Sequence, residues 1–462
     1  MRRSQLQSRR VRVLLYYSIL ITTLLLHHRY QYVVVEGLGN RKWNSRKPPS
    51  KDTNTKKDSQ IAMLSKALRT IYNQGGTLGV LQQSRGMENY PAPLLVKAAV
   101  EASSGDNGMA SGILNALLGS CCGDGGSVGG GGGKIKTGAK MAIDLIEAYD
   151  HPSIQLQPNL VALSLAFMAT SQDPEFVNRA DEFLDRAEQV YSSTTSSSSS
   201  SSVVKDKPDV DWSMLQQRHD IRLLQDANEF VVVSKPSGMV CYHGAAASKP
   251  RRKQENRKSD LSLEECLQQH GVPLSTLNKE GRGLVHRIDR GTSGCLVLAK
   301  TNRMHAILIA HFFLRNVKKS YQALVCNPPS SSSSSSSHLN DQGSINLDID
   351  GRPAKSTYYV EERFGDWVSR VKVYTEQGRR HQVRIHCAQG LKSPILLDPL
   401  YGGQAIMSSS KQFENMQSLR KLRAAKKFCL HADRLAVPEE GIDARAPLPD
   451  WWQQLENEID SY

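Results

Sequence analysis

Apolar residues recur every three or four positions through the first part of the chain, between residues 60 and 191. This spacing puts them on one side of a helix, and Gly, Pro and Asn residues separate the successive segments. The pattern therefore predicts an all-α domain of short helical hairpins. Such hairpins could stack as an α-solenoid, in which each pair covers the apolar face of its neighbour, and a plain helical bundle is the alternative.

The pattern becomes that of strands in the second half of the chain. Phe230–Val233 and Cys295–Ala299 are short apolar runs typical of buried strands. Ser369–Tyr374 alternates between apolar and polar residues, as a half-buried antiparallel strand does. Residues 302–316 carry apolar positions at helical spacing. We therefore expect an α+β domain with a mixed, mainly antiparallel sheet.

Segments of low complexity divide the chain. A serine tract that ends at Ser202 is a flexible linker, a Gly-rich run at 123–133 is an insertion, and Ser330–Ser337 interrupts the second domain as a surface loop. The expected organisation is a leader at 1–59, a helical domain at 60–191, a linker at 192–215, an α+β domain at 216–440 and a C-terminal tail at 441–462.

The chain is strongly basic, with 59 Lys and Arg residues against 45 Asp and Glu residues, a formal charge of +14 and a pI near 9.3. This excess indicates a polyanionic partner, either nucleic acid or an anionic membrane surface, although part of it lies near the N-terminus. The loop 245–260 is basic and would contact phosphates or remain solvated. The eight cysteines form no C-x-x-C pair, so we expect reduced, buried thiols without a zinc site or disulfide framework.

The N-terminus has the features of a targeting leader. Residues 1–12 contain five arginines and no acid, and Val13–Leu26 is a nearly apolar run, shorter than the roughly 20 residues that span a bilayer. These features fit a secretory signal, and the basic, acid-poor segment Leu38–Ser59 fits a transit peptide. We expect an organelle, plastid or mitochondrion, and no stable membrane insertion after processing; an uncleaved signal anchor is the alternative.

A short polar turn lies between two apolar, strand-like runs of the second domain, Leu284-Val285 before it and Cys295–Ala299 after it. Asp289 stands between Arg287 and Arg290, and Thr292-Ser293-Gly294 returns the chain into the second run. Gly294 allows a backbone conformation that other residues resist. An arginine in contact with an aspartate favours the ionised carboxylate. The turn therefore predicts a carboxylate suited to nucleophilic attack, and a surface salt bridge or a turn-capping Asp is the alternative.

Residues 286–294 read H-R-I-D-R-G-T-S-G and resemble the signature H-R-L-D-x-x-T-S-G of the RluA-type pseudouridine synthases. Further segments resemble that family in the same order, over about Ile221–Pro438. They are K-P-S-G at 235–238, K-S-Y-Q-A-L-V at 319–325, G-R-R-H-Q-V-R-I-H at 378–386, S-P-I-L-L-D-P-L-Y-G at 393–402 and L-H-A at 430–432. Arg380 departs from the family's usual Thr, and Leu397 stands where glycine is common.

The resemblance implies roles for particular side chains. Asp289 would be the catalytic nucleophile, Tyr321 would lie against the target base, and Arg384 would pair with the aspartate. The planar fork of Arg384 can hold a carboxylate bidentately, so Arg384, rather than the adjacent arginines, is the expected direct partner of Asp289. The residues expected to contact RNA are Lys235, Arg287, Arg290, Arg379 and His381.

The function implied by the resemblance is isomerisation of uridine to pseudouridine in ribosomal, transfer or messenger RNA. The reaction involves no net redox change and no group transfer, so no metal or cofactor is expected; the expected partner is RNA, and the expected state is a monomer. Residues 140–189, where Pro158-Asn159 would open a helix, resemble degenerate pentatricopeptide repeats, which implies recognition of single-stranded RNA. The alternative is a non-catalytic RNA-binding or RNA-folding protein with an inactive synthase domain, but retention of Asp289, Tyr321 and Arg384 argues against it.

Overall fold

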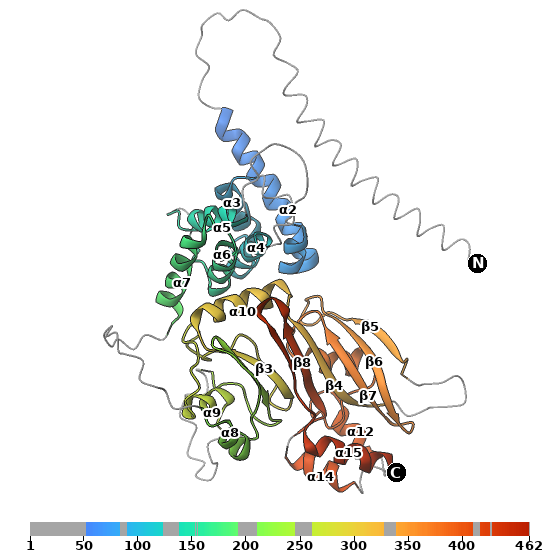
Figure 1. Cartoon of the computed structure of the whole chain (residues 1–462). Coiled ribbons are helices and arrows are strands. Elements are labelled where there is room, and N and C mark those ends of the chain that lie inside the picture. Colours follow the sequence, from blue (N-terminus) through green and yellow to red (C-terminus); the bar gives the residue numbers. More distant parts are fainter. Residues whose placement is uncertain are drawn as a thin grey trace, which may run out of the picture. The chain divides into compact units, whose positions relative to one another are not determined.

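The computed structural model describes residues 52–83, 90–122, 138–152, 154, 156–192, 210–244, 261–327, 339–409, 416–425 and 427–461 (Figure 1). Several features expected from the sequence lie outside these ranges. They are nearly all of the leader, the Gly-rich run, most of the linker, the basic loop 245–260 and the second serine tract. Among the described residues, no helix is long and apolar enough to cross a membrane.

The first described part is all-helical, as predicted. Its helices are α2 (Asp52–Gln83, kinked at Gly76), α3 (Ala92–Ser103), α4 (Asn107–Ser120), α5 (Gly138–Tyr149), α6 (Leu160–Ser171) and α7 (Val177–Tyr191). Pro158-Asn159 does open a helix, because the Asn159 side chain accepts a hydrogen bond from the Ala162 N–H at 2.9 Å at the start of α6. Residues 162–170 of α6 are all buried. A helix buried on all sides lies among its neighbours, which favours the bundle over the solenoid.

The second described part contains a nine-stranded sheet, as expected for an α+β domain (Figure 1). Its strands are β1 (Arg222–Asp226), β2 (Phe230–Lys235), β3 (Ser293–Ala299), β4 (Lys318–Cys326), β5 (Gln342–Asn346), β6 (Lys355–Phe364), β7 (Val368–Thr375), β8 (Leu430–Val437) and β9 (Ile442–Arg445). The order is β1-β2-β3-β8-β4-β7-β6-β5, and β9 pairs with β8. β3 and β8 pair in parallel and the other described pairings are antiparallel, so the predicted mixed, mainly antiparallel sheet is confirmed.

The register of the central strands brings distant motifs together. His431 of β8 is opposite Ser293 of β3 on one side and Gln322 of β4 on the other. Asp289 lies four residues before Ser293, and Tyr321 is adjacent to Gln322. The turn that carries Asp289 and the residue expected to face the base therefore lie at the same edge of the sheet.

Helices and short turns complete this domain. They are α8 (Trp212–His219), α9 (Leu263–Gln269), α10 (Asn302–Leu314), α11 (Gln382–Ile385), a π-helical turn (His386–Gly390), α12 (Gly403–Ser409), α14 (Gln417–Ala424), a 3-10 turn (Pro438–Glu440) and α15 (Asp450–Asp460). α10 begins after Thr301, whose hydroxyl accepts the Met304 N–H at 3.2 Å. It ends at Arg315, whose φ of 67° is in the left-handed region.

Two expectations differ from the structure. The segment 441–462, expected to be a tail, forms β9 and α15, because Trp452, Leu455 and Ile459 present one apolar face that is buried in the core. The apolar run before Asp289 is not a strand, since Leu284 forms only an isolated bridge with Leu298.

Close packing explains the glycine that the sequence singled out in the turn. Gly294 has a φ of +110°, and a Cβ there would lie 2.1 Å from the Ala432 carbonyl oxygen of β8. Only glycine allows this approach of β3 to β8.

All eight cysteines are free, and six of them are buried, whereas Cys121 and Cys122 are partly exposed.

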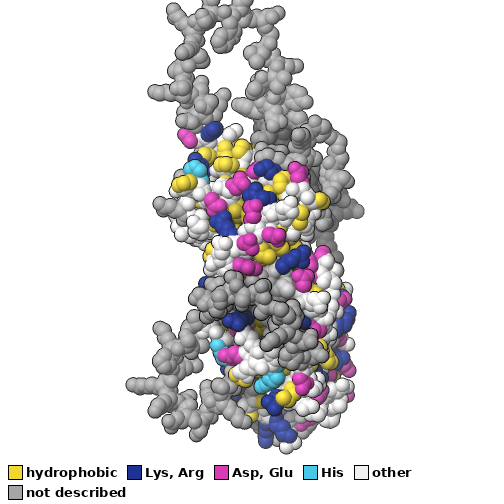
Figure 2. All heavy atoms as spheres, turned by 60° about the vertical axis from the view of Figure 1, so that its left-hand side comes forward, with side chains coloured by type: hydrophobic (Ala, Val, Ile, Leu, Met, Phe, Trp, Pro, Cys, Tyr) yellow, Lys and Arg dark blue, Asp and Glu magenta, His cyan; other side chains and the backbone are white. Residues whose placement is uncertain are grey.

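Charge is distributed without a single basic patch on the face of the molecule shown in Figure 2. On the described residues visible there, Lys and Arg side chains are interspersed with Asp and Glu side chains. The overall charge of +14 therefore does not identify an RNA-binding surface on this face by itself. The arrangement of individual cations around the site is more informative.

Candidate active site

The turn that carries Asp289 is fixed by the K-P-S-G segment that follows β2. Lys235 is fully buried, and its ammonium donates to the carbonyl oxygens of Pro236 at 2.9 Å, Met239 at 2.8 Å and Arg290 at 3.4 Å. The Ser237 hydroxyl donates to the Gly291 oxygen at 2.6 Å. These bonds hold the backbone immediately after Asp289. Lys235 is thus a structural residue of the turn and does not reach out to RNA phosphates, contrary to the expectation from the sequence.

Asp289 makes the expected ion pair. Its Oδ2 accepts a hydrogen bond from Nη1 of Arg384 at 3.0 Å, although the two residues are 95 positions apart. The Arg384 side chain is 4% exposed and that of Asp289 is 28% exposed. The carboxylate is therefore open to a ligand on one side and anchored to a buried cation on the other.

The bidentate contact of Arg384 is made with a different carboxylate. Nε and Nη2 of Arg384 donate to the two oxygens of Asp398 at 2.7 and 2.8 Å, and the Asp398 side chain is fully buried. The guanidinium also packs on the rings of Tyr401, 5.1 Å to its centroid, and Phe428, 4.6 Å to its centroid. Asp398 thus fixes the fork of Arg384 so that only Nη1 is directed to Asp289.

No role was predicted for Asp398 from the sequence, although the residue lies in a segment that resembles the family. Its Oδ1 also accepts the N–H groups of Leu400 at 2.9 Å and Tyr401 at 3.3 Å, which closes the loop around it. Leu397, where glycine is common, is buried with a φ of 70°. The loop therefore keeps a left-handed residue at this position, at a cost of about 1–2 kcal/mol for a side chain with a Cβ.

His381 faces the other oxygen of the same carboxylate. Its Nε2 lies 3.7 Å from Asp289 Oδ1, and its Nδ1 is 2.8 Å from the Tyr401 hydroxyl. Burial lowers the pKa of His381, and the charges of Arg384 and Arg380 lower it further, while Asp289 and Asp398 oppose this shift. A neutral His381 can exchange a proton with Tyr401 or with a ligand beside Asp289. The structure thus places His381 within the Asp289 cluster.

Tyr321 extends from β4 into the same cavity as Asp289 and Arg384. Burial raises the pKa of its phenol, and the charge of Asp289 raises it further. The hydroxyl is therefore protonated at neutral pH, and its ring offers a flat surface beside the carboxylate. This position is compatible with stacking on a base and with donation of a hydrogen bond.

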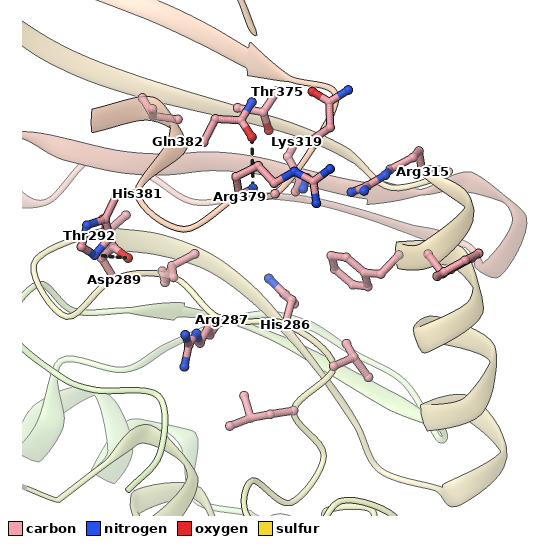
Figure 3. Close-up of a pocket in the computed structure, with 18 of the residues that line it drawn as sticks. His286, Arg287, Asp289, Thr292, Arg315, Lys319, Thr375, Arg379, His381 and Gln382 are labelled. Carbon is pink, nitrogen blue, oxygen red and sulfur yellow. Dashed lines mark hydrogen bonds and ion pairs between the residues drawn. The ribbon is translucent and has the colours of Figure 1, made fainter. Parts of the chain in front are cut away.

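A cavity of about 540 Å³ joins these residues, within the range of roughly 300–1,000 Å³ typical of small-ligand sites. Figure 3 shows Asp289, Thr292 and His381 gathered on one side of it and Arg315, Lys319 and Arg379 on another. Leu160 and Val161, at the start of α6, also line it. In the described ranges, no group of three or more His, Cys, Asp and Glu side chains could hold a metal ion.

The other residues expected to contact RNA occupy different positions. Arg287 is exposed at the cavity, where its Nη1 lies 3.5 Å from the Tyr242 hydroxyl. Arg290 is exposed, and its Nε donates to the Gly238 oxygen at 2.7 Å. Arg379 is half-buried in the cavity, with Nε 3.4 Å from the Pro353 oxygen. Of these three arginines, Arg287 and Arg379 are placed to meet a ligand in the cavity.

Known proteins resemble the half of the chain that contains this site. Residues 229–389 match the family described as RNA pseudouridylate synthase. The ribosomal large subunit pseudouridine synthase D of Xanthomonas campestris pv. campestris is 31% identical over 243 residues, which cover 51% of this chain and 68% of that protein. The enzyme of the same name from Pasteurella multocida is 27% identical over 243 residues, covering 51% of this chain and 69% of its own.

A solved structure also aligns with this half of the chain. It is that of human RNA pseudouridylate synthase domain containing 4, with a TM-score of 0.37 and 22% identity, covering 51% of this chain and 92% of the other. The identity to the Xanthomonas protein over two thirds of its length and the matching family segment agree with the motifs of the sequence. This chain belongs to the RluA-type family of RNA pseudouridine synthases.

Proposed function

We propose that Asp289 is the residue that acts on the ribose of the target uridine and that Arg384 holds its carboxylate in position. The observation that carries this proposal is the 3.0 Å pair between Arg384 and Asp289 in a cavity that also contains Tyr321. The pair leaves Asp289 Oδ1 free of Arg384, so one oxygen can approach the substrate. Uridine has to leave its base stack to enter such a cavity, at a cost of a few kcal/mol.

The isomerisation breaks the bond from ribose C1′ to N1 of uracil and forms a bond from C1′ to C5. The C5 proton is lost and N1 gains a proton, so atoms and charge balance without a second substrate. Asp289 would either attack C1′ or assist glycal formation from the ribose. In the first route the carboxylate forms an ester bond to C1′ as the C1′–N1 bond breaks, and in the second it takes the C2′ proton as that bond breaks. The carboxylate is released, or returns the proton, when C1′ bonds to C5 of the rotated uracil.

Tyr321 and His381 have complementary parts in this proposal. The neutral ring of Tyr321 would hold the detached uracil by stacking, and its hydroxyl would donate a hydrogen bond. His381, 3.7 Å from the second oxygen of Asp289, would accept or return a proton as C5 loses one and N1 gains one. Tyr401 at 2.8 Å from His381 Nδ1 fixes the orientation of that ring.

We further propose ribosomal RNA as the substrate class, because the two relatives named above are ribosomal large subunit synthases. Pseudouridine mapping of the total RNA of cells with and without the protein tests this proposal. Loss of pseudouridine from ribosomal RNA supports it, whereas loss confined to transfer or messenger RNA contradicts it.

The expected organellar location rests on residues 1–59 alone, and localisation of fusions with and without this segment tests it.

The catalytic proposal is tested by Asp289→Asn, which keeps the size of the side chain and removes its charge. We expect the rate of pseudouridine formation in RNA from cells lacking the protein to fall by about 1,000-fold or more. Asp341→Asn is the matched control, because that aspartate is 89% exposed and pairs with Arg363. Wild-type activity in Asp289→Asn would show that another residue acts on the ribose.

A further inference from the structure

Three cations line the cavity away from Asp289. Arg315 is the C-cap residue of α10, Lys319 is the second residue of β4, and Arg379 follows β7, so three separate parts of the fold contribute them. In Figure 3 their charged groups gather on one side of the cavity, whereas Asp289 and His381 lie on another. The cavity therefore carries a carboxylate in one region and a group of positive charges in a second region.

The three charges are close enough to repel one another. Burial lowers the pKa of Lys319 to about 8, and the charge of Arg315 lowers it further. Burial also lowers the pKa of Arg315, with a contribution from Arg379. A Cβ added at Gly378, next to Arg379, would lie 3.2 Å from Lys319 Nζ. Like charges in such proximity are unfavourable unless an anion binds between them.

No carboxylate compensates these cations within the described residues. None of the three has an Asp or Glu oxygen within 4.0 Å there. An adjoining cavity is lined by Arg315 and Arg379 together with two aspartates, Asp348 and Asp350. Both aspartates are exposed, and neither forms an ion pair with any of the three cations. The protein thus keeps a net positive site at this position.

Arg315 is the most informative member of the group. Its Nε is buried, and no hydrogen-bond partner is present for it among the described residues. The left-handed backbone at Arg315, with φ 67°, turns the chain from α10 towards β4. A buried donor without a partner is destabilising, and a ligand oxygen can supply the missing hydrogen-bond acceptor. The position of Arg315 therefore suits an anion that enters through the cavity.

We propose that Arg315, Lys319 and Arg379 form a phosphate subsite that binds a phosphodiester group adjacent to the target uridine. This inference rests on the proposed function, since it assumes that the uridine lies at Asp289. Guanidinium groups suit phosphate because their N–H donors match pairs of phosphate oxygens, and Lys319 adds a point charge. Binding there would orient the strand and offset part of the cost of extruding the base.

The test measures binding of a short, labelled oligouridylate to the full chain carrying Asp289→Asn, which prevents turnover. Arg315→Asn removes the charge, and asparagine tolerates the left-handed backbone. We expect this change to weaken binding about tenfold and to lower the slope of log affinity against log salt by about 0.7, the contribution of one phosphate contact. Arg315→Lys, which keeps the charge, should retain most of the affinity.

Two further variants complete the test. Arg303→Asn is the matched control on α10, because Arg303 pairs with Glu229 and does not line the cavity. Lys319→Met keeps the side-chain stem near the Phe312 ring and should weaken binding as Arg315→Asn does, so the proposal is testable even if one variant does not fold. Unchanged salt slopes in both variants, or an equal loss in Arg303→Asn, would overturn the phosphate subsite. Retained catalysis by Asp289→Asn would instead overturn the proposed role of Asp289.

Discussion

The cavity has two regions that differ in how their charged side chains are arranged, one around Asp289 and one around Lys319. Around Asp289, the buried charges are paired: Arg384 contacts Asp289 through one nitrogen and Asp398 through two. Around Lys319, three cations lie together and no carboxylate forms an ion pair with them in the described part of the chain. Paired buried charges hold a geometry, whereas unpaired ones store unfavourable energy that a ligand can release. The side chains of the first region are thus held in place by ion pairs within the protein, whereas the cations of the second region would be compensated by a phosphate of the bound RNA.

The largest expected effect comes from breaking the paired region. Asp398→Ala leaves the buried fork of Arg384 without its bidentate partner, and loss of one partner of a buried pair costs about 3–5 kcal/mol. We expect urea unfolding to report this loss in the free energy of unfolding. Pseudouridine formation should also fall, because Arg384 can then turn away from Asp289.

The control for this prediction is an ion pair of the same chemistry at the surface. Asp341→Ala removes the partner of Arg363, and an exposed pair contributes about 0–1 kcal/mol. Replacing both buried partners, as Arg384→Met with Asp398→Leu, should recover much of the stability without recovering activity. A loss below about 1 kcal/mol in Asp398→Ala would contradict the role of Asp398 as the anchor of Arg384.

The sequence was sufficient for the pairing of Asp289 with Arg384, because each residue lies in a segment with a strong family resemblance. It was insufficient for Asp398, whose burial depends on how the loop at 393–402 folds against α11. Lys235 was expected to contact RNA because a lysine near a catalytic motif is a plausible phosphate ligand. Its burial under three carbonyl groups could not be read from the four residues of K-P-S-G.

The fold shows the same contrast between local pattern and tertiary packing. Strands such as β7 were predictable from alternation alone. The spacing of Trp452, Leu455 and Ile459 is also a helical signal, and it would have extended the domain beyond residue 440. By contrast, Arg315 lies in no motif, and its proximity to Lys319 and Arg379 arises only when α10, β4 and β7 meet.

A comparison of two lysines sharpens the difference between the regions. Lys235→Met should lower the free energy of unfolding by about 1–3 kcal/mol, because the carbonyl oxygens it binds lose their donor. Lys319→Met should leave stability unchanged or raise it by about 1 kcal/mol, because a charge beside Arg315 is removed. Urea unfolding measures both effects. Equal destabilisation by the two changes would mean that Lys319 has a structural partner and is not held for a ligand.

The smallest expected effect is a pH dependence of RNA binding that originates in the unpaired region. Burial lowers the pKa of Lys319 to about 8 in the free protein. The groups around it are Phe312 of α10, the Arg315 that follows this helix, His286 and Arg379. His286 is neutral there, since burial lowers its pKa to about 3, with a contribution from Lys319. As pH rises through about 8, Lys319 loses its proton and its attraction for phosphate, so affinity should fall about fourfold between about pH 6.5 and 8.5.

The Asp289→Asn chain titrated with oligouridylate over this range provides the measurement, and Lys319→Met should remove the pH dependence. Lys235, whose pKa burial also lowers to about 8, remains in that variant. A fourfold change that persists in Lys319→Met would therefore assign the titration to the turn beside Asp289 and not to the phosphate subsite.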